Sequence, residues 1–146
     1  MKISRVGLTL LGTACLLAAC SSNSGSGSNP VACVPPAGDT PFLAFPASGS
    51  TGNSPNIGQV IVADQTALGS GWDAVVTVSG IGSQLGGTFQ PAALPLPSPN
   101  ATPPFANPVY ESSAFNVAVP AGSTVQVSVN NLNSTCTPVV IGSFGT

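Results

Sequence analysis

The chain has 146 residues, of which 42% are hydrophobic and only 4% are charged, whereas an average soluble domain has about 25% charged residues. It contains no histidine, and its only basic residues, Lys2 and Arg5, lie at the very start. The rest of the chain therefore lacks the usual bases of catalysis and the cations that bind phosphate groups. We expect a protein that is not an enzyme, needs no cofactor and binds no nucleic acid.

Positive charge followed by an apolar stretch marks the beginning of the chain. Lys2 and Arg5 precede Val6–Ala19, which is shorter than the roughly 20 residues that a helix needs to cross a bilayer. This arrangement is typical of a secretory signal peptide, which we assign to residues 1–19. A buried apolar helix is the alternative.

The apolar stretch ends in the tetrad LAAC, formed by Leu17, Ala18, Ala19 and Cys20. This tetrad resembles the lipobox of bacterial lipoproteins. The resemblance implies cleavage before Cys20 and transfer of a diacylglycerol to its thiol, so that acyl chains such as palmitate hold the protein at the membrane. The expected location is the bacterial cell envelope, outside the cytoplasm. Ser21, in place of an aspartate, favours the outer membrane if the host has one. A plain secretory signal without lipid is the alternative.

The next segment, Ser21–Pro30, has the sequence SSNSGSGSNP and contains neither a charge nor a large apolar side chain. Such a composition favours a flexible coil with a root-mean-square span of about 17 Å. We therefore assign residues 20–30 to a lipidated cysteine and a tether, and residues 31–146 to one folded domain.

Apolar residues alternate with polar ones in the second half of this domain. Phe115–Val119 and Thr124–Val129 both show the period of two that a strand with one buried face requires. Pro120–Ser123 between them has the composition of a tight turn, so we expect a β-hairpin here.

Five further strands are expected, and the one covering Leu85–Gln90 is the weakest. The others are Pro41–Phe45, Ile57–Ala63, Trp72–Ser79 and Val139–Phe144. No stretch of 31–146 combines helical periodicity with freedom from Gly and Pro. Short strands at this spacing predict an all-β fold, an antiparallel β-sandwich of about seven strands.

Two segments are similar to bacterial immunoglobulin-like and fibronectin type III domains. Phe45–Ala63 resembles the opening of the first kind, with a Pro-x-x-Gly-x-Thr-Gly turn before the second strand. Val119–Val129 resembles the corner between two late strands, although the tyrosine typical of that corner is absent. Trp72 occupies the place of a core tryptophan. The resemblance implies an immunoglobulin-like sandwich.

Three cysteines follow the apolar stretch of the signal. With Cys20 assigned to lipid by the lipobox resemblance, Cys33 and Cys136 are left as a pair. An exported protein matures where disulfides form, so we expect a bridge between the segment before the first strand and the loop before the last. Two free thiols or a redox pair are the alternatives.

The proline-rich stretch 91–108 cannot be a central strand, because its prolines lack amide donors. We expect a connection that covers a sheet edge. The alternative is a partner-binding surface with Leu94, Leu96 and Phe105 as its apolar contacts.

The four acidic residues, Asp39, Asp64, Asp73 and Glu111, are scattered along the chain. They match no calcium-binding motif, so we expect solvated loop carboxylates and no metal site.

Two functions remain. The first is a non-catalytic, envelope-anchored lipoprotein whose immunoglobulin-like domain has a structural or adhesive role. The second is a ligand-binding module for envelope glycans or peptides. Trp72 and Tyr110 are its only tryptophan and tyrosine, and a buried Trp72 would remove the main stacking platform for a sugar.

Overall fold

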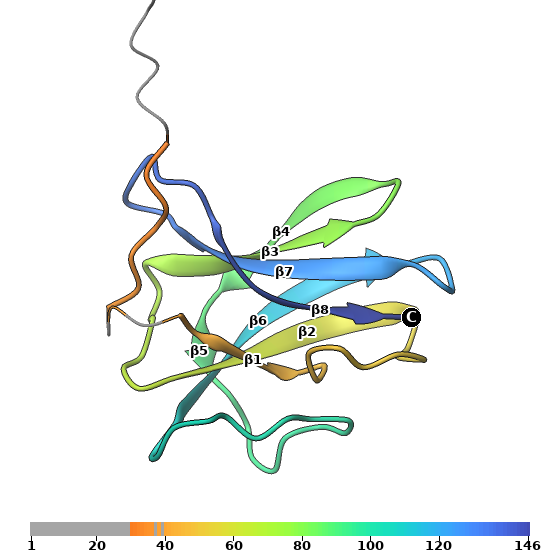
Figure 1. The fold of residues 1–146 in the computed structure, drawn as a ribbon, viewed down its shortest axis with the longest axis horizontal. Coiled ribbons are helices and arrows are strands. Elements are labelled where there is room, and N and C mark those ends of the chain that lie inside the picture. Colours follow the sequence, from red (N-terminus) through yellow and green to blue (C-terminus); the bar gives the residue numbers. More distant parts are fainter. Residues whose placement is uncertain (1–29, 37, 39) are drawn as a thin grey trace, which may run out of the picture.

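Eight strands form two antiparallel sheets that pack face to face in a computed structural model that describes residues 30–36, 38 and 40–146 (Figure 1). The first sheet has the order β1-β2-β6-β5 and the second has the order β4-β3-β7-β8. The strands are β1 (Phe42–Phe45), β2 (Asn56–Asp64), β3 (Trp72–Val78), β4 (Gly82–Thr88), β5 (Gln90–Pro91), β6 (Val109–Ala118), β7 (Thr124–Asn131) and β8 (Val139–Gly145). The expected all-β sandwich is confirmed.

The strand order is that of the immunoglobulin fold. Lettered in chain order as A, B, C, C′, D, E, F and G, the two sheets read A-B-E-D and C′-C-F-G. There are eight strands rather than about seven because the weak strand expected at Leu85–Gln90 is divided between the two sheets. Phe89 lies at the division, where its ring is buried in the core and its amide donates to the carbonyl of Trp72 at 3.0 Å.

The core lies between the sheets and is built from the alternating apolar residues of each strand. Val125, Val127 and Val129 of β7 are fully buried and face the apolar side chains of the other sheet. Trp72 belongs to the same cluster and is only 5% exposed. The tryptophan is therefore a core residue, as the resemblance implied.

The hairpin expected between Phe115–Val119 and Thr124–Val129 is wrong. β6 pairs with β2 and β5, whereas β7 pairs with β3 and β8, so the two strands lie in opposite sheets. Pro120–Ser123 carries the chain from one sheet to the other. Alternation could not distinguish the two arrangements, because each strand buries one face in either case. The resemblance to a late-strand corner describes this connection correctly.

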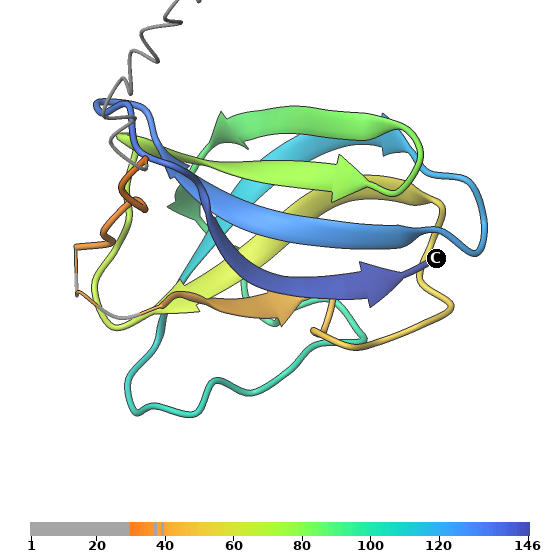
Figure 2. The same cartoon turned by 45° about the horizontal axis from the view of Figure 1, so that its top comes forward.

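The proline-rich stretch connects β5 at one edge of the first sheet to β6, passing β1 at the opposite edge on its way. Figures 1 and 2 show it on the side of that sheet away from β3 and β7. Ile61 and Ala63 point to this side, by alternation with core residues, yet are at most 1% exposed. The connection therefore covers a face of the sheet as well as an edge.

The N-terminal segment is fastened to the second sheet. Cys33 and Cys136 form the expected disulfide, with a Cα–Cα distance of 4.9 Å and a separation of 103 positions. The amide of Cys33 also donates to the carbonyl of Thr137. The domain thus begins at a fixed point beside the β7–β8 connection.

The predicted signal residues Leu17, Ala18 and Ala19, the lipidation site Cys20 and the tether lie outside the described residues, as does Asp39. Within the described part, no helix is long and apolar enough to cross a membrane.

Candidate functional site

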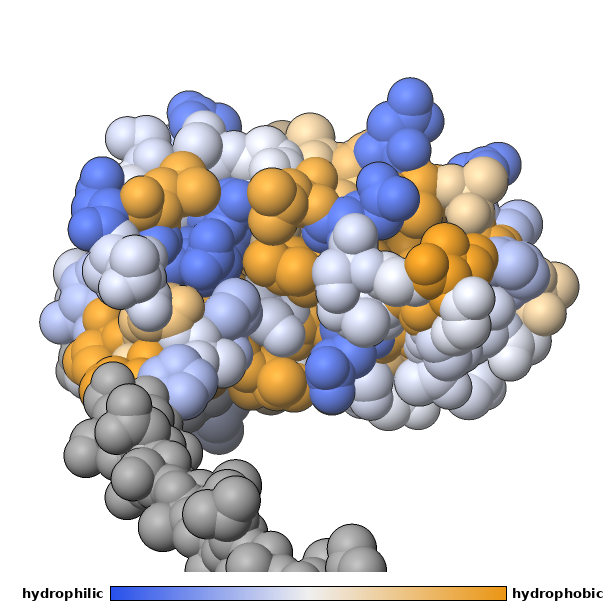
Figure 3. Space-filling model, turned by 90° about the horizontal axis from the view of Figure 1, so that it is seen from above, coloured by the Kyte–Doolittle hydropathy of each residue, from blue (hydrophilic) through white to orange (hydrophobic). Residues whose placement is uncertain are grey.

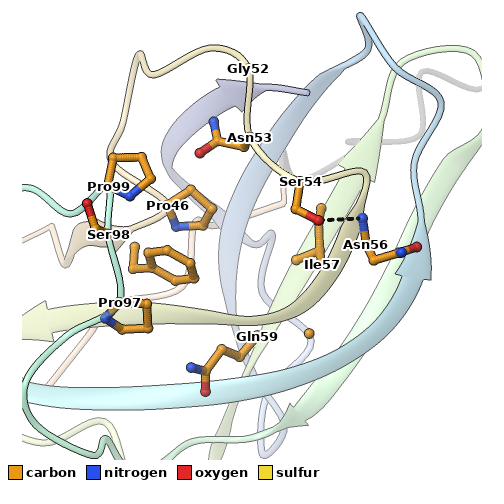
Figure 4. A pocket seen from close by; sticks show the side chains of 12 residues that line it. Pro46, Gly52, Asn53, Ser54, Asn56, Ile57, Gln59, Pro97, Ser98 and Pro99 are labelled. Atoms are coloured by element: carbon orange, nitrogen blue, oxygen red, sulfur yellow. Dashed lines mark hydrogen bonds between the residues drawn. The ribbon is translucent and has the colours of Figure 1, made fainter.

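A groove of about 450 Å³ opens where the β1–β2 connection meets the proline-rich stretch (Figure 4). One side comes from the end of β1 and from residues 52–59, and the other comes from residues 97–99. Figures 1 and 2 show the β1–β2 connection at the end of the sandwich opposite to Pro30, where the described chain begins. The groove therefore lies at the end of the domain that is farthest from the expected tether.

Hydrogen bonds fix the first wall of the groove. The hydroxyl and the amide of Ser50 both donate to the carbonyl of Ala47, at 2.6 and 3.0 Å. The side-chain amide of Asn53 donates to Ser50 Oγ and to the carbonyl of Gly145, both at 2.9 Å. Gly49 has a φ of 81°, which favours glycine at this bend. The connection is thus held against β8.

The second wall is joined to the edge of β1. Ala101 donates its amide to the carbonyl of Ala44 at 2.9 Å, and Ala47 donates to the carbonyl of Pro99 at 3.2 Å. The side-chain amide of Asn100 closes the turn by donating to the carbonyl of Pro97 at 2.9 Å. Because prolines have few conformations to lose on folding, ordering this wall costs less conformational entropy than ordering an ordinary loop.

The lining of the groove carries no charge. Its apolar part is formed by Phe45, Pro46, Ile57, Pro97 and Pro99, and its polar part by the amides and hydroxyls of Asn53, Ser54, Asn56, Gln59 and Ser98. Amides and hydroxyls can both donate and accept hydrogen bonds. Such a surface suits a neutral ligand that has apolar faces and hydroxyl or amide groups.

The groove does not contain the three residues that the sequence proposed for binding. Leu94 is 68% exposed, whereas Leu96 and Phe105 are half-buried, and none of the three lines the groove. The groove and the surface suggested by the sequence therefore share the proline-rich stretch but none of these three residues, and partner binding at the three residues stays a prediction. The groove needs residues 52–59 as its other wall, and no local pattern signals that these two segments meet.

The aromatic residues do not form an open platform. Trp72 is buried, and Tyr110 on β6 is half-buried. The interpretation of the domain as a sugar-binding module loses the stacking surface that it relied on. Phe45, also half-buried, is the aromatic residue that lines the groove.

The expectation of solvated carboxylates is wrong for the three described acids. Asp64, Asp73 and Glu111 are only 2%, 3% and 5% exposed. Glu111 accepts the amides of Leu68 and Gly69 at 2.5 and 3.0 Å. Because they are buried, we interpret these carboxylates as structural residues of the fold.

The other two described acids also accept hydrogen bonds. Asp73 accepts from the side-chain amide of Asn130 across β3 and β7 at 3.1 Å, and Asp64 accepts the amide of Gln65. Among the described residues, no group of three or more Asp, Glu, His or Cys lies close enough to hold a metal ion.

Comparison with protein-family models, with curated proteins and with solved structures finds no match to this chain.

Proposed function

We propose that the protein is a non-catalytic lipoprotein of the bacterial envelope, anchored through acylated Cys20, whose immunoglobulin-like domain has a structural or adhesive role. The observation that carries the proposal is that the two ends of the domain differ. The disulfide fixes the start of the domain at one end, and the groove lies at the other. A short tether on the first end would leave the second end facing away from the membrane.

The chemistry of the chain supports a role without catalysis. The chain contains no histidine, and its only lysine is Lys2. The three described carboxylates are buried within the fold. A serine or threonine nucleophile would lack a conventional base. Such a surface suits binding a partner or holding two parts of the envelope apart, rather than catalysing bond cleavage.

The anchor is tested by substituting one cysteine at a time in the full chain. We expect wild-type protein to incorporate labelled palmitate and to require detergent for extraction from membranes, whereas Cys20→Ser loses both properties. Cys15→Ser, which changes a cysteine within the apolar stretch, is the matched control and keeps both. Equal labelling of the Cys20→Ser variant and the wild type would overturn the proposed anchor.

The groove favours a second candidate function, which is the binding of a neutral envelope glycan or peptide. Gly58 lines the groove, and a Cβ atom built on it meets nothing within 4 Å. A Cβ atom is therefore accommodated at this position, and we expect the large side chain of a Gly58→Trp variant to obstruct the groove.

We expect a neutral oligosaccharide of N-acetylated amino sugars, or a neutral peptide, to bind the wild type and to lose at least about tenfold in affinity on Gly58→Trp. Tenfold corresponds to about 1.4 kcal/mol. Ala67→Leu, an exposed site in the β2–β3 connection, is the control. Titration followed by NMR measures both, and the second function falls if neither probe binds the wild type or if both variants bind equally.

A further inference from the structure

Three of the four sheet edges are protected. Two of them make main-chain hydrogen bonds to neighbouring loops, and the third is a very short strand. The carbonyl of Ala44 on β1 accepts from Ala101 in the proline-rich stretch. On β8, Gly145 exchanges main-chain bonds with Ser50 and Asn53. β5 contains only two residues and ends in Pro91. Such covers and prolines are the usual protection of edge strands against pairing with other chains.

The fourth edge is open. β4 (Gly82–Thr88) pairs with β3 on one side, and within the described residues its other side makes no main-chain pairing with any strand. The end of β4 turns towards β6, where Gly87 accepts a hydrogen bond from Ser113. The unpaired donors and acceptors therefore belong to its first half, up to Leu85.

Side chains at this edge favour association. Leu85 is 71% exposed, and Ile81 just before the strand is 54% exposed. β4 has neither a charged residue nor a proline. Ser83 is held by a 2.8 Å hydrogen bond between its hydroxyl and that of Thr77 on β3, so the strand is braced in an extended form. An exposed, uncharged strand of this kind is ready to add another strand.

We propose that this edge pairs with the same edge of a second copy of the chain. Antiparallel pairing of two β4 strands about a two-fold axis is self-complementary, because each backbone offers its partner the same donors and acceptors. It would join the two four-stranded sheets into one continuous sheet of eight strands.

The electrostatics favour a second copy as the occupant. The three described acids are buried, and the described residues include no lysine or arginine, so no charged side chain is exposed on this part of the molecule. Two copies can approach without repulsion between like charges. Figure 3, which views the molecule from the side on which β4 lies, shows apolar and polar residues interspersed there, so pairing through the backbone does not depend on one large apolar patch.

The pairing has a consequence for the arrangement of the two copies. β4 runs along the long axis of the domain, and the described chain begins at one end of that axis (Figures 1 and 2). Antiparallel pairing reverses one copy, so the two N-terminal ends lie at opposite ends of the pair. If the adhesive role proposed above holds, such a pair fits a contact between two anchored surfaces.

The experiment is sedimentation velocity on the purified full chain in mild detergent, up to about 1 mM, the order of effective concentration that short tethers give. We expect a concentration-dependent dimer for the wild type and a monomer for Leu85→Lys, which places two like charges at the pair. Leu94→Lys, at an equally exposed leucine in the proline-rich stretch, is the control and keeps the dimer.

Cross-linking gives a second reading that does not depend on the lysine variant. Leu85→Cys, oxidised by copper phenanthroline, should form a disulfide-linked dimer, whereas Leu94→Cys should not. A wild type that stays monomeric throughout, or equal cross-linking at the two sites, overturns the pairing. Neither result bears on Cys20, because the β4 edge is the same with or without a lipid.

Discussion

Glu111, which the sequence predicted to be a solvated loop carboxylate, is a buried residue that holds a connection between strands. It lies on β6, opposite Val62 of β2, with its side chain directed to the end of the core. There its two carboxylate oxygens accept the amides of Leu68 and Gly69, so one buried charge braces the β2–β3 connection. A buried carboxylate that accepts backbone amides is stabilised by charge-assisted hydrogen bonds.

We therefore expect Glu111→Ala to lower the free energy of unfolding by about 2–4 kcal/mol, because hydrogen bonds to charged groups contribute about 1.5–3 kcal/mol and the amides left behind lose their partner. Glu111→Gln, which keeps one acceptor oxygen, should lose less. Urea unfolding followed by tryptophan fluorescence measures both variants. A Glu111→Ala protein as stable as the wild type would show that the carboxylate is not the brace.

Two neighbouring glycines on β4 offer a second test at the residue scale. A Cβ atom on Gly86 would lie 2.6 Å from the ring of Phe115 and closer still to the hydroxyl of Ser113. A Cβ atom on Gly87 would have its nearest neighbour at 3.9 Å, on the backbone of Ala114. The close approach of β4 to β6 therefore depends on Gly86.

Gly86→Ala should destabilise the domain by about 1–3 kcal/mol, the usual cost of overpacking a filled site. Gly87→Ala, its matched control, should stay within about 0.5 kcal/mol of the wild type. Thermal unfolding of the two variants side by side tests the difference. If both variants unfold at the same temperature, β4 does not approach β6 as described.

At the scale of elements, the sequence predicts where the strands lie better than how they pair. Val125, Val127 and Val129 alternate with polar residues and are buried as expected. The same alternation predicted a hairpin with Phe115–Val119, because a period of two shows which face is buried and says nothing of the neighbouring strand. Only the resemblance of Val119–Val129 to a late-strand corner contained information on the crossing between sheets.

The groove lay beyond sequence reasoning for a related reason. Its walls, residues 52–59 and 97–99, meet because the proline-rich stretch is hydrogen-bonded to the β1 edge. Ala101 donates its amide to the carbonyl of Ala44, and Ala47 donates its amide to the carbonyl of Pro99. Neither wall has an apolar period or a motif that points to the other. Long-range contacts of this kind depend on the fold as a whole.

The disulfide was predictable because, once the lipobox resemblance assigned Cys20 to lipid, Cys33 and Cys136 were the pair that remained after the apolar stretch. Its removal should be costly, since it constrains the unfolded chain over 103 positions. We expect the double variant Cys33→Ala/Cys136→Ala to lose between about 2 and 5 kcal/mol of stability, from the greater freedom of the unfolded state. Urea unfolding of the double variant, with reduced wild type beside it, is the measurement. An unchanged midpoint in both would contradict the role of the bridge.

At the scale of the whole molecule, the described surface is notable for its lack of charge. The acids are buried and basic side chains are absent from the described residues. Contacts made by this surface must therefore rely on backbone hydrogen bonds, neutral polar groups and apolar area, none of which is screened by salt.

The dimer proposed through β4 should accordingly keep the same dissociation constant, within about twofold, when salt is raised from about 0.05 M to about 0.5 M, a range over which exposed charge pairs would be strongly screened. Leu85→Lys provides the contrast, because salt should partly restore its pairing. Sedimentation velocity at the two salt concentrations tests both statements. A wild-type dimer that dissociates in high salt would mean that charged groups outside the described residues hold it together.

Intact mass spectrometry of protein purified from membranes without reductant tests the proposed lipid anchor and the disulfide together, and most directly. We predict a chain that begins at Cys20, heavier by its acyl groups and lighter by two hydrogens for the Cys33–Cys136 bridge. A mass without lipid would make this a protein without a membrane anchor. A mass that shows free thiols at Cys33 and Cys136 would contradict the disulfide that fixes the start of the domain.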